Sequence, residues 1–195
     1  MQHASDYAEL VCVSNFTFLT GASHPQELVA RAAELGFRAF AITDVCSMAG
    51  VVRALEESRR CAQRGCPIQL IPGAFFHLEN GSRLVLLPQD HAGYTQICML
   101  ITQGRRDAPK GEYALPDRRF ERNLDHCLAI WLPEKRMGPD TKRMGPDTVF
   151  DQKRYPAPFL PAPFLPTANW LAAYFPGRCW LGLDHPLGPN DPQHA

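Results

Sequence analysis

The segment at residues 39–50, AFAITDVCSMAG, constrains the fold of this chain more than any other stretch. Its apolar part, residues 39–42, predicts a short buried strand; Thr43 and Asp44 predict a polar turn, and a helix is expected to begin near Ser47. A strand, an acidic turn and a helix in this order place a carboxylate at the C-terminal edge of a parallel sheet or barrel. Asp44 is therefore the first candidate for a functional residue.

The same alternation of strands and helices runs through most of the chain and predicts an α/β fold with mostly parallel strands and one hairpin. Ser23 is expected to cap a helix through a capping box with Gln26, and Asp90 and Thr167 are expected to cap later ones. Further strands are expected at residues 7–13, 37–42, 68–71, 74–78, 84–87, 127–132 and 179–183, and helices at 47–64, 92–102, 116–123 and 169–175. Pro72 and Gly73 predict a turn, and residues 79–82 a hairpin loop.

Two exact tandem repeats interrupt this pattern. KRMGPDT at residues 135–141 recurs at 142–148, and PAPFL at 156–160 recurs at 161–165. Solenoid repeats are longer and more numerous, so we interpret these as duplications inside a tolerant loop. The expected organisation is a first domain segment at 1–132, a Pro-rich linker at 133–166 with extended character near its end, and a continuation of the domain at 167–195.

Composition narrows the classes of partner. Lysine plus arginine and aspartate plus glutamate each number 20, so net charge favours neither nucleic acid nor an acidic membrane. No apolar run is long enough to span a bilayer, the first residues lack signal-peptide features, and the seven cysteines include no CxxC pair. These features predict a cytoplasmic protein with free thiols and no membrane partner.

Several segments resemble the polymerase and histidinol phosphatase (PHP) domain found at the N-terminus of bacterial error-prone DNA polymerases. They are SNFTFLTGASHPQELVARAAELGFRAFAITDVCSMAGVVRA, RLVLLPQDHAGYTQICMLITQGRRDAPKGEY, CLAIWLP and WLAAYFPGRCWLGLDHPLGPND. The resemblance covers nearly all of the chain except the duplicated linker. It implies a distorted β/α barrel, here incomplete, with metal ligands at its C-terminal rim.

The family's ligand motifs are mostly absent from this sequence. Val11 and Val13 stand at the two histidines of the His-x-His motif, Asp44-Val45 replaces Asp-His, and Phe75 replaces the glutamate of Gly-x-Glu. Three protein ligands are the usual minimum for a catalytic metal, so one surviving aspartate is not enough. We therefore expect no metal, catalytic or cofactor-binding residue in this chain.

Asp44, Cys46 and His77 offer one alternative, a rebuilt metal site. The competing interpretation is that Asp44 caps the turn or the next helix, His77 lies on a half-exposed strand, and Cys46 is a small buried apolar residue.

Two basic clusters and three tryptophans are candidates for nucleic-acid contacts. The clusters, one of Arg105, Arg106 and Lys110 and the other of Arg118, Arg119 and Arg122, suit a DNA backbone or simply a solvated charged face. Trp131, Trp170 and Trp180 suit base stacking, but each lies in an apolar strand or helix pattern typical of a core.

Three hypotheses about function remain. In the first, the chain is an N-terminal PHP fragment of an error-prone polymerase, structural rather than catalytic, whose partners are the downstream polymerase domains; DNA and Mg²⁺ would be bound only in the full-length protein. In the second it is a free-standing PHP metallo-phosphoesterase. In the third it is the non-enzymatic remnant of a truncated polymerase gene, with open strand edges and poor solubility.

Overall fold

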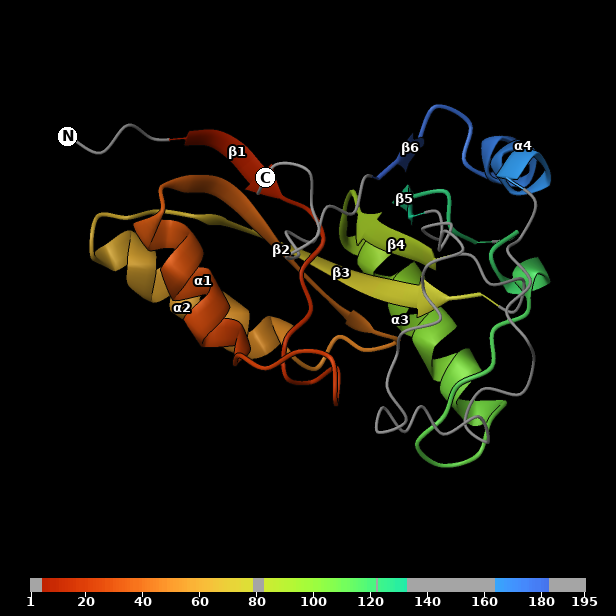
Figure 1. The fold of residues 1–195 in the computed structure, drawn as a ribbon, viewed down its shortest axis with the longest axis horizontal. Helices are drawn as coiled ribbons and strands as arrows, with labels where there is room; N and C mark the ends of the chain where they lie inside the picture. The colour runs from red at the N-terminus through yellow and green to blue at the C-terminus, as the bar shows by residue number, and fades with distance from the viewer. Residues whose placement is uncertain (1–4, 79–82, 122, 133–163, 183–195) are drawn as a thin grey trace, which may run out of the picture.

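The computed structural model describes residues 5–78, 83–121, 123–132 and 164–182. These residues form one six-stranded sheet with helices packed against it (Figure 1). The strands are β1 (Ser5–Glu9), β2 (Phe37–Val45), β3 (Gln69–His77), β4 (Arg83–Pro88), β5 (Cys127–Leu132) and β6 (Cys179–Leu181). The helices are α1 (Pro25–Glu34), α2 (Val51–Gln63), α3 (His91–Arg106) and α4 (Phe164–Tyr174), with a 3₁₀ turn, η1, at Asp117–Arg119.

The strands lie in sequence order across the sheet. β1, β2 and β3 are parallel, β4 is antiparallel to both β3 and β5, and β6 is parallel to β5. A groove of about 1010 Å³ is lined both by the edge strands β1 and β6 and by the central strands, so the sheet curves around one face. The fold is thus an incomplete α/β barrel, as expected from the sequence.

Alternate residues of the strands face the helices and the groove. Phe76 packs with Ile97 of α3 and Phe120, whereas its neighbour Phe75 lies in a separate cluster on the groove side with Leu87. A third cluster joins α1 and α2 to the start of the sheet. This period of two along β3 is that of a strand buried on both faces.

Two expected boundaries in the sheet are wrong. β2 continues through Thr43 and Asp44, where the sequence predicts a turn, and β3 runs unbroken through Pro72 and Gly73. Proline is tolerated at position 72 because the ladder between β3 and β4 begins only two residues later, at Ala74. Glycine is needed at position 73 because a Cβ there would lie 2.6 Å from Leu87 Cδ2.

The first strand and three helices also differ from expectation at their ends. β1 stops at Glu9 rather than residue 13, and α2 starts at Val51 rather than near Ser47. His24, not Ser23, is the N-cap of α1, where its N–H donates to Glu27 at 2.8 Å. α4 begins five residues early, so Thr167 lies inside the helix rather than capping it.

The cap of α3 was predicted correctly. The Asp90 carboxylate accepts a hydrogen bond from the Gly93 N–H at 2.9 Å, and α3 then continues beyond the expected end to Arg106. The hairpin loop at 79–82 and most of the Pro-rich linker lie outside the described residues, and the proposed division into three segments remains a prediction. Within the described residues, no helix has the length and apolarity needed to cross a bilayer.

Candidate functional site

Asp44 is fully buried near the C-terminal end of β2, where it holds the loop that follows β1. Its Oδ1 accepts hydrogen bonds from the Ser14 N–H at 2.8 Å and from the Thr17 hydroxyl at 2.7 Å. Its Oδ2 is 2.8 Å from the Ser14 hydroxyl, which is also buried. Both carboxylate oxygens are therefore engaged by donors from the chain itself, an arrangement that satisfies a buried anion without a cation.

The neighbouring threonines extend this polar contact. The Thr17 hydroxyl, besides donating to Asp44, accepts the Val45 N–H at 3.0 Å. Thr43 joins the same segment from the other side, because its Oγ1 accepts the Cys12 N–H at 2.9 Å and its N–H donates to the Cys12 carbonyl at 2.7 Å. One backbone bond and the Thr43 side chain thus hold this segment to β2 beyond the point where β1 ends.

The residues at the family's other ligand positions are apolar, and three of the four pack into hydrophobic clusters; Val13 is half-buried. Val11 lies against the groove-side cluster, Phe75 belongs to that cluster, and Val45 packs against it and against the core around Phe76. None of these side chains has an atom that can bind a cation. Together with the occupied oxygens of Asp44, the donor set does not fit the metal site that the PHP resemblance implies.

The alternative site of Asp44, Cys46 and His77 also lacks support. Among the residues that the structure describes, no three histidine, cysteine, aspartate or glutamate side chains are grouped so that they could hold a metal. Cys46 is buried at a left-handed φ of 45°, and burial raises the pKa of its thiol to about 11 although Arg105 acts in the opposite direction. Burial, and secondarily Arg83, lowers the pKa of His77, whose ring lies beside Phe75.

The basic clusters are only partly available for a ligand. Arg105 donates to the Cys46 carbonyl at 3.2 Å and lies over the Tyr113 ring, and Arg119 forms an ion pair of 2.7 Å with Asp107. Arg106, Lys110 and Arg118 are exposed, and Arg122 lies outside the described residues.

The three tryptophans have different environments. Trp131 is buried in the core, and Trp170 is half-buried against that core with its ring beside Tyr174, so neither is an open stacking platform. Trp180 is exposed at the mouth of the groove, contrary to the expectation that it packs in the core.

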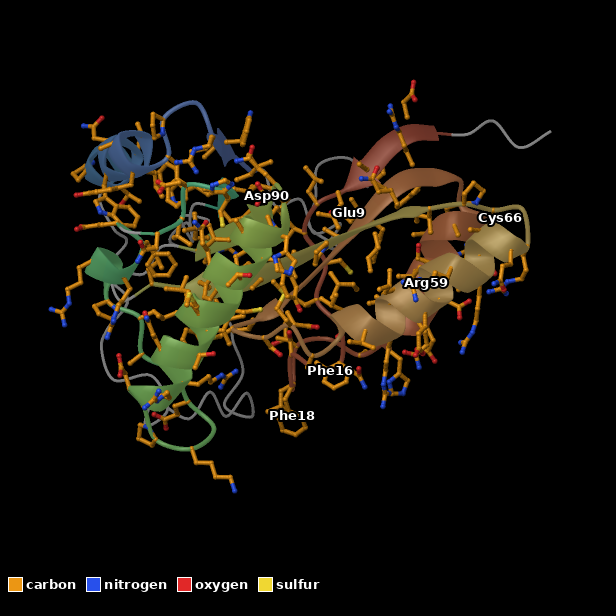
Figure 2. The ribbon with its side chains drawn as sticks, turned by 180° about the vertical axis from the view of Figure 1, so that it is seen from behind. Glu9, Phe16, Phe18, Arg59, Cys66 and Asp90 are labelled. Atoms are coloured by element: carbon orange, nitrogen blue, oxygen red, sulfur yellow. The ribbon has the colours of Figure 1, made fainter. Side chains whose placement is uncertain are left out.

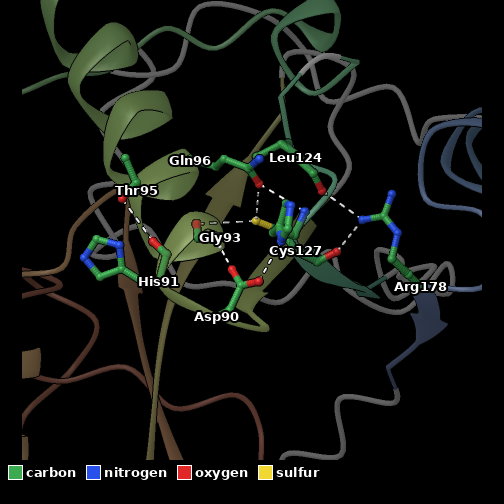
Figure 3. Close-up of polar contacts among 9 residues, drawn as sticks. Asp90, His91, Gly93, Thr95, Gln96, Leu124, Cys127 and Arg178 are labelled. Atoms are coloured by element: carbon green, nitrogen blue, oxygen red, sulfur yellow. Dashed lines mark hydrogen bonds and ion pairs between the residues drawn. The ribbon is translucent and has the colours of Figure 1, made fainter.

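A second polar cluster lies where β4 leads into α3 and β5 begins (Figure 3). Asp90 Oδ2 is 2.6 Å from His126 Nδ1, and the thiol of Cys127 donates weakly to the Gly93 carbonyl and to Gln96. Burial raises the pKa of Cys127 to about 12, so this cysteine, histidine and aspartate do not make a nucleophile.

Arg178 completes that cluster from the far end of the chain. Its Nη1 donates to the carbonyls of Leu124 and Cys127 at 2.8 and 2.7 Å. The cluster therefore fastens the start of β6 to the start of β5 and has the contacts of a structural clasp.

Sequence reasoning missed Ser14 and Thr17, the partners of Asp44. The only available signal was the pair of small hydroxyl residues, three apart, in the loop after the first strand. That pattern is common in ordinary loops, so it did not identify a partner for a carboxylate 27 to 30 residues away.

Comparison with known proteins gives consistent results. The family model described as "PHP domain" matches residues 9–130. Over 95% of the chain, identity is 45% to an error-prone DNA polymerase of Methylococcus capsulatus and 43% to one of Aromatoleum aromaticum. The matched part is 15% of the length of each of these relatives.

Among solved structures, an amidohydrolase from Chromobacterium violaceum is 24% identical with a TM-score of 0.41, covering 51% of this chain and 33% of that one. This similarity is too weak to support an inference about activity. The family match, which spans most of the described sheet, agrees with the incomplete barrel and with the position of Asp44 at its rim. The chain belongs to the PHP domain family.

Proposed function

We propose that this chain is the N-terminal PHP segment of an error-prone DNA polymerase and serves there as a scaffold rather than as a phosphoesterase. One observation carries the structural role: the rim aspartate is fully used in holding the 14–21 loop, through Ser14 and Thr17. The groove, whose lining includes Val11 and Phe75 but not Asp44, is lined largely by hydrocarbon. A hydrolytic metal site needs free oxygen or nitrogen ligands at that rim.

In this proposal the chemistry of DNA synthesis belongs to other parts of a longer polypeptide. Nucleotidyl transfer would use acidic residues and Mg²⁺ in a downstream domain, during cytoplasmic DNA repair or translesion synthesis. This chain would contact DNA only in that full-length context, where the exposed Arg106, Lys110 and Arg118 are among the available cations. The small share of each relative that the chain matches supports this division of roles.

Metal analysis tests the non-catalytic part of the proposal. The purified chain is incubated with Mn²⁺ or Zn²⁺, desalted, and assayed for bound metal and for hydrolysis of a phosphodiester. We expect well below one metal ion bound per chain and no phosphodiester hydrolysis that EDTA inhibits. Stoichiometric metal with chelator-sensitive hydrolysis, both lost in Asp44→Asn, would favour the phosphoesterase hypothesis instead.

A binding measurement tests the scaffold role. The Methylococcus capsulatus polymerase is expressed without its matched segment, and association with this chain is measured by biolayer interferometry. We expect saturable binding and a larger soluble yield of the truncated polymerase when the two are co-expressed. Failure of the chain to bind would contradict the scaffold role.

A further inference from the structure

The 14–21 loop presents two large apolar side chains to solvent. Phe18 and Leu19, which we name the apolar tip, are each 82% exposed, and Phe16 beside them is 40% exposed. Figure 2 shows Phe18 projecting beyond the ribbon at the end of this loop, with Phe16 next to it. Apolar side chains placed together at a protruding loop end are typical of an interaction surface.

The base of this loop is firmly held, so the apolar tip has a defined position. Asp44 binds Ser14 and Thr17 below it, and the Thr17 carbonyl accepts the N–H groups of Thr20 and Gly21 at 3.1 and 3.0 Å. Any side chain at Gly21 would collide with the Ser14 carbonyl, since a Cβ there would lie 2.0 Å from its oxygen. The polar contacts hold the loop without burying its apolar residues.

The backbone at the apolar tip is strained. Leu19 has a φ of 63°, a left-handed conformation that a bulky side chain rarely adopts. This strain gains no burial for Leu19 within the chain. A local conformational cost at an exposed position points to a function outside the fold of this segment.

We propose that the apolar tip inserts into an apolar pocket on another domain of the polymerase polypeptide. This inference rests on the proposed function and identifies the surface through which the scaffold acts. The matched segment makes up 15% of each relative, so most of the polymerase lies outside this chain and is available as the occupant.

The chemistry of the loop favours a folded protein over nucleic acid. Residues 14–21, SNFTFLTG, contain no lysine or arginine to neutralise phosphate. The cation that does contact the loop belongs to α2: the guanidinium of Arg53 lies over the Phe16 ring, 5.6 Å from its centre. A loop whose backbone is already held in place loses less conformational entropy on docking, which suits a preformed pocket.

The experiment uses the same interferometry with the truncated Methylococcus capsulatus polymerase. The test variant is Phe18→Ser with Leu19→Ser. The control variant is Met99→Ser with Leu35→Ser, which removes two other exposed apolar side chains, 60% and 49% accessible. Circular dichroism melts establish that both variants remain folded, as expected for exposed positions.

We expect the test variant to weaken binding by about tenfold or more, as loss of a central apolar anchor does, and the control variant to change it by less than about twofold. Equal binding by the test variant and the unaltered chain would overturn the apolar tip while leaving the scaffold role intact. Absence of binding by the unaltered chain would instead overturn the scaffold role. Loss of self-association or of binding to lipid vesicles in the test variant, without loss of polymerase binding, would also overturn the proposed occupant.

Discussion

Replacing Asp44 by alanine should destabilise the chain severely. The substitution leaves three buried donors without an acceptor: the Ser14 N–H, the Ser14 hydroxyl and the Thr17 hydroxyl. A buried donor without a partner costs about 1–3 kcal/mol, so a loss of roughly 3–6 kcal/mol is expected after partial relaxation. That is a large fraction of the roughly 5–15 kcal/mol that stabilises a typical domain.

Milder substitutions at the same contact make the prediction quantitative. Asp44→Asn keeps one oxygen acceptor, and its amide can donate to the Ser14 hydroxyl, so it should cost about 1–3 kcal/mol. Thr17→Val removes one donor to Asp44 and the acceptor of the Val45 N–H, and should cost a similar amount. Glu56→Ala, an exposed acidic position on α2, is the control and should change stability by less than about 0.5 kcal/mol.

Urea unfolding, followed by circular dichroism, gives the free energy of unfolding of each variant. If Asp44→Ala is too unstable to measure, Asp44→Asn and Thr17→Val still provide the comparison. The interpretation fails if Asp44→Ala lies within about 1 kcal/mol of the unaltered chain, since three orphaned donors cannot cost so little. It also fails if Mn²⁺ raises the melting temperature of the unaltered chain and Asp44→Asn abolishes that rise.

Three further predictions follow from packing and from pKa shifts. Gly50→Ala should cost about 1–3 kcal/mol in urea unfolding, because the new Cβ would lie 2.8 Å from the buried rim carboxylate, whereas a tolerated methyl group would contradict the packing described. Ellman's reagent at pH 8 should modify exposed Cys66 rapidly but reach Cys46 and Cys127 only on unfolding, since burial raises the pKa of their thiols to about 11 and 12; fast labelling of either would refute this. The pKa of His77 is lowered in the folded state, so the unfolded chain binds its proton more tightly. The free energy of unfolding should therefore be unaffected by His77 above about pH 6.5 and should fall as the pH drops below that value. His77→Gln should flatten this pH dependence.

The fold was largely predictable where one local signal dominated. β5 matches its predicted range because CLAIWL is an unbroken apolar run between His126 and Pro133, and α3 follows its predicted cap, Asp90. The alternation of strands and helices also predicted the α/β class.

Prediction failed where a long-range contact outweighed the local signal. Pro72 and Gly73 are turn residues in isolation, but pairing with β2 and the close approach of Leu87 hold them in β3. Thr167 is a good cap by composition, yet it is buried within α4.

The candidate site, like the fold, could be predicted from the sequence only in part. The hydrocarbon at residues 11, 13, 45 and 75 can be read from the sequence once the PHP resemblance is noticed. The role of Asp44 cannot be read from the sequence, because Ser14 and Thr17 lie in the loop after the first strand and contact Asp44 only in the folded chain. Sequence reasoning expected an acid that caps a turn, and the structure shows one that anchors a separate loop.

Within the part of the chain that the structure describes, β1 and β6 are the edge strands of the sheet, and this has a practical consequence for handling the isolated chain. The mouth of the groove between β1 and β6 carries exposed Tyr7, Trp180 and Leu181. Exposed apolar residues on the edge strands of a sheet offer a template for self-association. Storage losses should therefore grow with protein concentration, and a charged substitution at Leu181 should be an effective remedy in a crystallisation sample.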